Sequence, residues 1–184
     1  MRYFTLFLFL VMFMPVPAAL AAPEADVLFE WMQGEWTAQG ERSFPGTSQR
    51  VVIDASVSAT VENETLISRN HIRETPLNAD GTSGRGREYD RTYWIRARKE
   101  AAPPPTVEYE LGYGTDPAGP VTSLGVLRHN VLVVEQKIGG TPEQPAFLIR
   151  SETEFTGLET VYRETSWYNG IVNTETTIRY QRAR

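Results

Sequence analysis

The residues best suited to binding chemistry lie in a C-terminal hairpin predicted around Asn169-Gly170. An Asn-Gly pair favours a two-residue type I′ turn, which fixes the register of the two flanking strands. In that register Arg163 shares the inner face with Thr174 and Thr176. An inward guanidinium needs a partner, because an unpaired buried charge is costly. The alternatives are a ligand carboxylate or phosphate, an internal salt bridge, or a shifted register in which Arg163 points outward.

Aromatic side chains on the predicted inner face provide a candidate wall for a binding cavity. Trp167 belongs to the same hairpin, and three tyrosines alternate with other residues in two preceding segments. Such side chains either fill a core or line a cavity whose hydroxyls orient a ligand, and both interpretations stay open here. The candidate ligand-binding residues are Arg163, Trp167, Tyr93, Tyr109, Tyr113, Thr174 and Thr176.

Residue types that support catalysis or metal binding form no recognisable motif. The chain has no Cys, which excludes thiolate zinc sites, iron–sulfur clusters and cysteine nucleophiles. His71 and His129 lie far apart in the sequence, and we expect surface or turn positions for them. Residues 81–86 match neither a phosphate-binding loop nor a serine-hydrolase motif. We therefore assign no catalytic residue, no metal and no cofactor, and expect a binding protein rather than an enzyme.

Strands must position these residues, because the chain after residue 33 consists of runs with period-two alternation or with β-branched and aromatic enrichment, broken by turn residues. The clearest case is residues 107–113, where Val107, Tyr109, Leu111 and Tyr113 share one face. A single short helix is expected over 23–33, where Pro23 suits a first helical turn. The expected strands span 34–44, 49–58, 62–74, 87–98, 106–113, 121–127, 131–138, 146–156, 159–168 and 171–182.

The predicted fold class is all-β. About ten antiparallel strands joined by short loops most simply form a meander that closes on itself, since closure removes unpaired strand edges. The sequence therefore predicts an up-and-down β-barrel with one short N-terminal helix.

The N-terminal segment predicts export. Arg2 precedes an apolar run over residues 3–14, and Ala19-Leu20-Ala21 fits the small-residue pattern of a cleavage site. The run is shorter than the roughly 20 residues that span a bilayer. We expect a secretory signal peptide over 1–21 and one barrel domain over 22–184, located in the periplasm or secreted and without a membrane span.

Charge restricts the class of partner. The 184 residues carry a net charge of -5, with a pI near 5.2. An acidic chain is unsuited to a nucleic-acid backbone or an anionic membrane. The expected partner is a small hydrophobic or amphipathic molecule, and the sequence does not determine the oligomeric state.

Gly34-Glu35-Trp36, directly after the predicted helix, resembles the G-x-W opening of lipocalin-like (calycin) barrels. The resemblance implies an antiparallel barrel of about eight to ten strands. It also implies that the motif's tryptophan closes one end and packs against an arginine of the last strand. In this chain Gly34, Trp36 and Arg182 would form that closure. Tyr180 and Arg182 stand in the reverse order of the R-x-Y motif of fatty-acid-binding proteins, so the resemblance assigns no lipid carboxylate.

The sequence supports an exported protein that holds a largely apolar ligand, which can carry an acidic group, in the barrel lumen. One alternative is an isomerase or lyase on the same barrel, and another is a ligand-free structural or interaction module. An outer-membrane barrel is disfavoured, because the predicted outer face of the last hairpin carries Glu164, Glu175 and Arg179.

Overall fold

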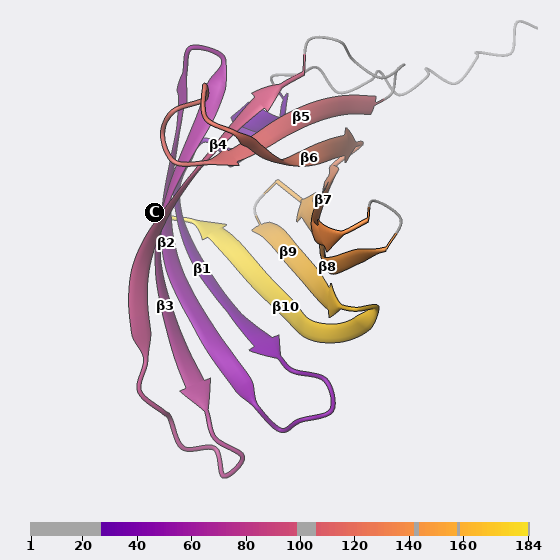
Figure 1. Cartoon of the computed structure of the whole chain (residues 1–184). Helices are drawn as coiled ribbons and strands as arrows, with labels where there is room; N and C mark the ends of the chain where they lie inside the picture. Colours follow the sequence, from indigo (N-terminus) through magenta and orange to yellow (C-terminus); the bar gives the residue numbers. More distant parts are fainter. Residues whose placement is uncertain (1–26, 99–105, 142–143, 158, 184) are drawn as a thin grey trace, which may run out of the picture.

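The computed structural model describes residues 27–98, 106–141, 144–157 and 159–183, which form a β-barrel with one short helix (Figure 1). The predicted signal peptide and the first residues of the predicted helix lie outside the described residues. The elements are α1 (Val27–Met32), β1 (Gly34–Ser43), β2 (Arg50–Glu62), β3 (Thr65–Leu77), β4 (Arg87–Ala97), β5 (Thr106–Tyr113), β6 (Val121–Arg128), β7 (Val131–Gly140), β8 (Pro145–Phe155), β9 (Glu159–Tyr168) and β10 (Ile171–Arg182).

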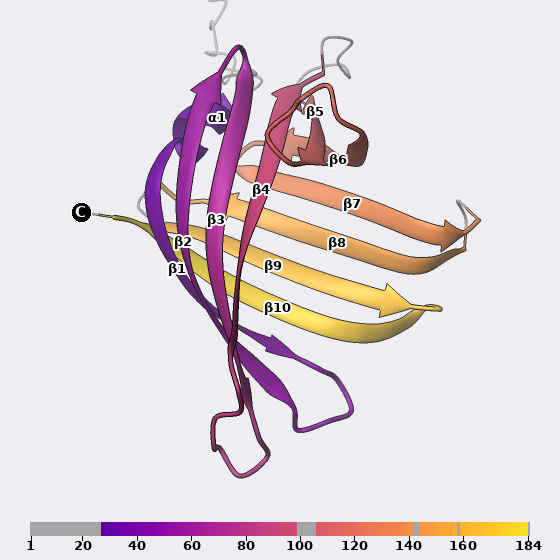
Figure 2. The ribbon, with the colours of Figure 1, turned by 60° about the vertical axis from the view of Figure 1, so that its left-hand side comes forward.

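The barrel is closed and entirely antiparallel. Each strand pairs with its neighbours in sequence, and β1 pairs with β10, with Trp36 opposite Arg182. Figure 2 shows β2, β3 and β4 running steeply while β7–β10 run across the view, so the two walls cross at a large angle. The predicted fold class and all ten expected strands are confirmed. Within the described residues, no helix is long and apolar enough to cross a membrane.

The last hairpin contains both a confirmed prediction and the main error in register. Asn169 and Gly170 have φ angles of 48° and 78°, as a type I′ turn requires. Val172 then pairs with Trp167, whereas Thr174 pairs with Ser166, so Asn173 is the extra residue of a β-bulge. Without the bulge, Thr176 would pair with Arg163. With it, Thr176 pairs with Glu164, so the face of β9 that points into the lumen is the one opposite to the prediction.

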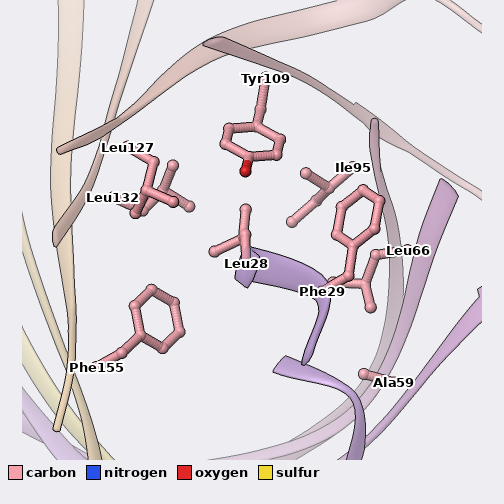
Figure 3. Packing of buried hydrophobic residues seen from close by; sticks show 9 residues of the cluster. All are labelled: Leu28, Phe29, Ala59, Leu66, Ile95, Tyr109, Leu127, Leu132 and Phe155. Atoms are coloured by element: carbon pink, nitrogen blue, oxygen red, sulfur yellow. The ribbon is translucent and has the colours of Figure 1, made fainter. Parts of the chain in front are cut away.

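The hydrophobic core lies at the end of the barrel where α1 enters. Leu28 and Phe29 of α1 are buried, and side chains from the surrounding strands point toward them (Figure 3). Fully burying one such side chain stabilises the fold by about 1.5–3 kcal/mol. The cluster comprises Leu28, Phe29, Ala59, Leu66, Ile95, Tyr109, Leu127, Leu132 and Phe155.

Candidate ligand-binding site

A cavity of about 410 Å³ lies inside the barrel. It borders the core cluster next to α1 and extends to a group of charged side chains on β1, β3 and β4. This volume lies within the range of small-molecule sites, which are mostly apolar with a few convergent polar groups. The apolar part of the wall includes Trp36, Ile53, Val57, Ile72, Ile95, Leu111, Val134, Ile149 and Ile178.

A charged network bounds the cavity at the end away from α1. Glu74 accepts hydrogen bonds from Arg42 Nη1 at 3.1 Å, Arg87 Nε at 2.7 Å and the Tyr89 hydroxyl at 2.8 Å. Arg42 also donates from Nε to Thr176 Oγ1 at 3.1 Å. Burial raises the pKa of Glu74, but the hydrogen bonds from Arg87 and Tyr89 and the charges of the two arginines outweigh it and lower the pKa. Glu74 is therefore a saturated carboxylate with a structural role.

Arg91 of β4 also lines the cavity, but its side chain is exposed to solvent, unlike the buried Glu74. Its guanidinium carbon lies 5.1 Å from the centre of the Tyr89 ring, and Nη1 lies 3.5 Å from the Tyr93 hydroxyl. Within the described part of the chain it forms no ion pair with a carboxylate. Arg91 is thus a cation held against aromatic rings at the wall, with hydrogen-bonding capacity left for an anionic group.

Tyrosines and one further carboxylate complete the polar wall. The rings of Tyr93 and Tyr113 pack with centres 5.3 Å apart. On β9 the Tyr162 hydroxyl donates to Glu164 Oε2 at 2.5 Å. Burial and the negative charge of Glu164 raise the pKa of Tyr162 well above its ordinary value, and they act in the same direction on Tyr180. These phenols therefore stay protonated near neutral pH.

The prediction that Arg163 anchors a ligand inside the barrel is wrong in its geometry. Its side chain is 53% exposed, and Nη1 pairs with Glu154 Oε2 at 3.3 Å on the outer face. The bulge at Asn173 causes the error, because it places Glu164 inside and Arg163 outside. The sequence predicted Glu164 on the outer face, and this prediction is wrong because Glu164 lines the cavity.

The predicted aromatic binding residues divide into three groups. Tyr93 and Tyr113 line the cavity. Tyr109 is fully buried in the core cluster beside α1, so it fills the closed end rather than the cavity wall. Trp167 pairs with Leu148 and lies on the outer face with Arg163.

Thr174 and Thr176 face inward as predicted, but protein partners occupy their hydroxyls. Thr174 Oγ1 lies 2.6 Å from Ser166 Oγ, and Thr176 accepts the hydrogen bond from Arg42. Both threonines are buried and lie outside the set that lines the cavity. They support the wall without presenting a free hydroxyl to a ligand.

The predicted contact at the closed end is present. The Arg182 guanidinium lies 5.0 Å from the centre of the Trp36 ring, and Arg182 Nη2 donates to the Glu30 carbonyl at 3.2 Å. Trp36 Nε1 donates to the Met32 carbonyl at 2.9 Å, which ties α1 to the barrel. Gly34 has a φ of 120°, a region that favours glycine, where the chain turns from α1 into β1.

The predicted binding residues leave out several that line the cavity, among them Arg91, Tyr162 and Glu164. Arg91 stands midway between Tyr89 and Tyr93, both of which the alternation places inward, so the same pattern predicts its orientation. No sequence pattern predicts that Glu164 faces the lumen, because the side of β9 on which it lies depends on the bulge in β10.

The outer wall carries charged groups that pair with one another. His71 Nδ1 lies 2.8 Å from Asp90 Oδ1 on the outer face, and both side chains are mostly exposed. His129 is exposed at the β6–β7 turn with a φ of 55°. Among the described residues, no group of three or more His, Cys, Asp or Glu side chains could hold a metal ion. A second hollow lies on the outer surface of β1, β2, β3, β4 and β10 and is lined mainly by polar and charged residues.

No family model matches the sequence, and no curated protein matches it. Among solved structures, the S-type phycobiliprotein lyase CPES from Guillardia theta is similar with a TM-score of 0.59 and 9% identity, over 88% of this chain and 94% of that chain. Rv2717c from M. tuberculosis is similar with a TM-score of 0.50 and 17% identity, over 89% of this chain and 99% of that chain. At these identities the likeness shows the fold alone. The chain has a lipocalin-like, ten-strand barrel fold.

Proposed function

We propose that the protein is an exported binding protein that holds one small, largely apolar molecule in the barrel lumen, with any acidic group of that molecule at Arg91. The observation that carries the proposal is the cavity of about 410 Å³, whose mostly apolar wall includes an arginine that forms no ion pair with any described residue. Burying apolar ligand surface supplies affinity, and a guanidinium supplies orientation. Arg91 takes the role that the sequence assigned to Arg163.

The test compares two neighbouring valines of β7. Val134 lines the cavity, whereas Val133 lies on the outer face opposite Glu152. Val134→Trp should fill the lumen and weaken binding of the fluorescent probe anilinonaphthalene sulfonate, which has an apolar body and an anionic group. Val133→Trp should leave its affinity unchanged. Thermal unfolding confirms that each variant is folded before binding is compared.

Arg91→Gln tests the anionic end. The proposal predicts about tenfold weaker sulfonate binding, because hydrogen bonds to charged groups contribute about 1.5–3 kcal/mol. Equal affinities in the wild type, Val134→Trp and Arg91→Gln would refute a lumen site.

Export rests on the predicted signal peptide. The intact mass of the protein recovered from the periplasm or the culture fluid should correspond to residues 22–184. The full-length mass, or recovery from the cytoplasm alone, would contradict export.

A second candidate is an isomerase or lyase in the same lumen. The contact between the Tyr162 hydroxyl and Glu164 supports it, because a protonated phenol beside a carboxylate provides a proton donor and an acceptor. Conversion of the natural ligand by the wild type, with loss of turnover in both Glu164→Gln and Tyr162→Phe, would support the enzyme. Binding without turnover would refute the enzyme and support the binding protein.

A further inference from the structure

The two carboxylates that line the cavity differ in how far their hydrogen-bonding capacity is used. Glu74 is surrounded by Arg42, Arg87 and Tyr89. Glu164 receives one hydrogen bond, from Tyr162, and forms no ion pair with any described residue. An ionised carboxylate has about four acceptor positions. Glu164 therefore retains acceptor capacity on the lumen side.

Tyr113 of β5, Tyr162 of β9 and Tyr180 of β10 line the same cavity as this carboxylate. The Tyr162 hydroxyl contacts Glu164 directly, and burial, with a smaller contribution from the negative charge of Glu164, raises the pKa of Tyr113 and of Tyr180. The Tyr113 ring packs on Tyr93, which also lines the cavity. The faces of neutral phenol rings attract cations, and the attraction grows when the cation is removed from water.

Arg91 is not the positively charged partner of Glu164. Arg91 belongs to β4 and Glu164 to β9, five strands apart in either direction around the barrel. Arg91 is held instead by Tyr89 and Tyr93. The lumen thus offers one cation and one anion on opposite walls, each without an ionic partner among the described residues. A partly desolvated carboxylate of this kind gains most from a positively charged hydrogen-bond donor.

We propose that the lumen ligand carries a protonated nitrogen, such as a primary ammonium group, that binds Glu164 among Tyr113, Tyr162 and Tyr180. This inference rests on the proposed function, because it names the chemical class of the molecule in the same cavity. With an acidic group at Arg91, the ligand is an amphoteric molecule with an apolar body.

Three probes that share one tail and differ in head group test the inference: octylammonium, octan-1-ol and octanoate. Calorimetric titration should show octylammonium binding about tenfold more tightly than octan-1-ol to the wild type. Glu164→Gln should abolish that difference, because it removes the charge with almost no change in side-chain shape. Glu175→Gln is the matched control, since it removes the same charge from the exposed outer face of β10.

The outcomes separate this inference from the carrier proposal. If octan-1-ol and octanoate bind in competition with anilinonaphthalene sulfonate while octylammonium gains nothing over octan-1-ol, the cationic subsite is refuted and the carrier proposal stands. If no probe binds, both are refuted. Should Glu164→Gln fail to fold, the ranking of the three probes on the wild type still decides.

Discussion

The buried carboxylate of Glu74 allows a quantitative test of how the end of the barrel away from α1 is held. Its side chain is 5% exposed, whereas Arg87 is 67% exposed. Glu74→Gln keeps the shape and one acceptor oxygen, but it removes the negative charge and places an NH2 group against Arg42 or Arg87, so one of the two ionic hydrogen bonds is lost and the other is weakened. A hydrogen bond to a charged group contributes about 1.5–3 kcal/mol and a neutral one about 0.5–1.5 kcal/mol. Since the exposed Arg87 contributes little, we expect a loss of about 2 kcal/mol.

Thermal and urea unfolding at pH 7, followed by tryptophan fluorescence, measure this loss. For a domain of this size, about 2 kcal/mol corresponds to a Tm lowered by roughly 4–8 °C. Glu88→Gln is the matched control, because Glu88 is 57% exposed and pairs with Arg73, which is 63% exposed. It should cost less than about 0.5 kcal/mol. Equal losses in the two variants would refute the structural role of the network.

The pH dependence of the same pair has a defined sign. The pKa of Glu74 is lowered in the folded protein, so its ionisation stabilises the fold above its ordinary pKa of 4.5. That contribution disappears as the pH falls through the lowered pKa. The difference in free energy of unfolding between the wild type and Glu74→Gln should therefore shrink below about pH 4.5. A difference that grows on acidification would contradict the assignment.

Three further substitutions probe other parts of the barrel. Gly112→Ala would bring a Cβ within 2.2–2.5 Å of the Trp94 ring, so urea unfolding should show a loss of about 1–3 kcal/mol, and an unchanged midpoint would contradict the close packing. Arg182→Gln should lower the free energy of unfolding by about 1 kcal/mol through loss of the contact with Trp36. Arg163→Gln should change stability by less than about 0.5 kcal/mol and leave probe affinity unaltered, since its side chain is exposed; weaker binding would restore Arg163 as an anchor.

The strands and the closed barrel were predictable because they depend on local signals. Alternation in residues 107–113 identifies a strand with one buried face, and Asn169-Gly170 identifies a hairpin. The contact between Trp36 and Arg182 followed from the family resemblance, and these two residues are direct partners across β1 and β10.

The inner face of β9 was not predictable, because both of its faces are of mixed polarity. Val161 and Trp167 share a face with Arg163, whereas Thr160 and Tyr162 share a face with Glu164. Neither set is clearly the core side, so only the register with β10 could decide. Nothing in the local sequence around Asn173 signals a bulge, and a single extra residue exchanges the two faces.

The distinction between a paired and an unpaired charge in the lumen also lies beyond the sequence. Arg42 and Arg91 are both inward-facing arginines on predicted strands. Arg42 pairs with Glu74, 32 positions away on β3, whereas Arg91 meets only aromatic partners among the described residues. Tertiary neighbours, rather than the alternation of either strand, determine which arginine is left for a ligand.

The central claim is that one small molecule occupies the lumen, and native mass spectrometry of the protein isolated from its exporting cells tests it most directly. The wild type should carry a single adduct of defined mass that is retained in Val133→Trp and lost in Val134→Trp. A bare polypeptide mass for the wild type, or the same adduct on Val134→Trp, would contradict the claim.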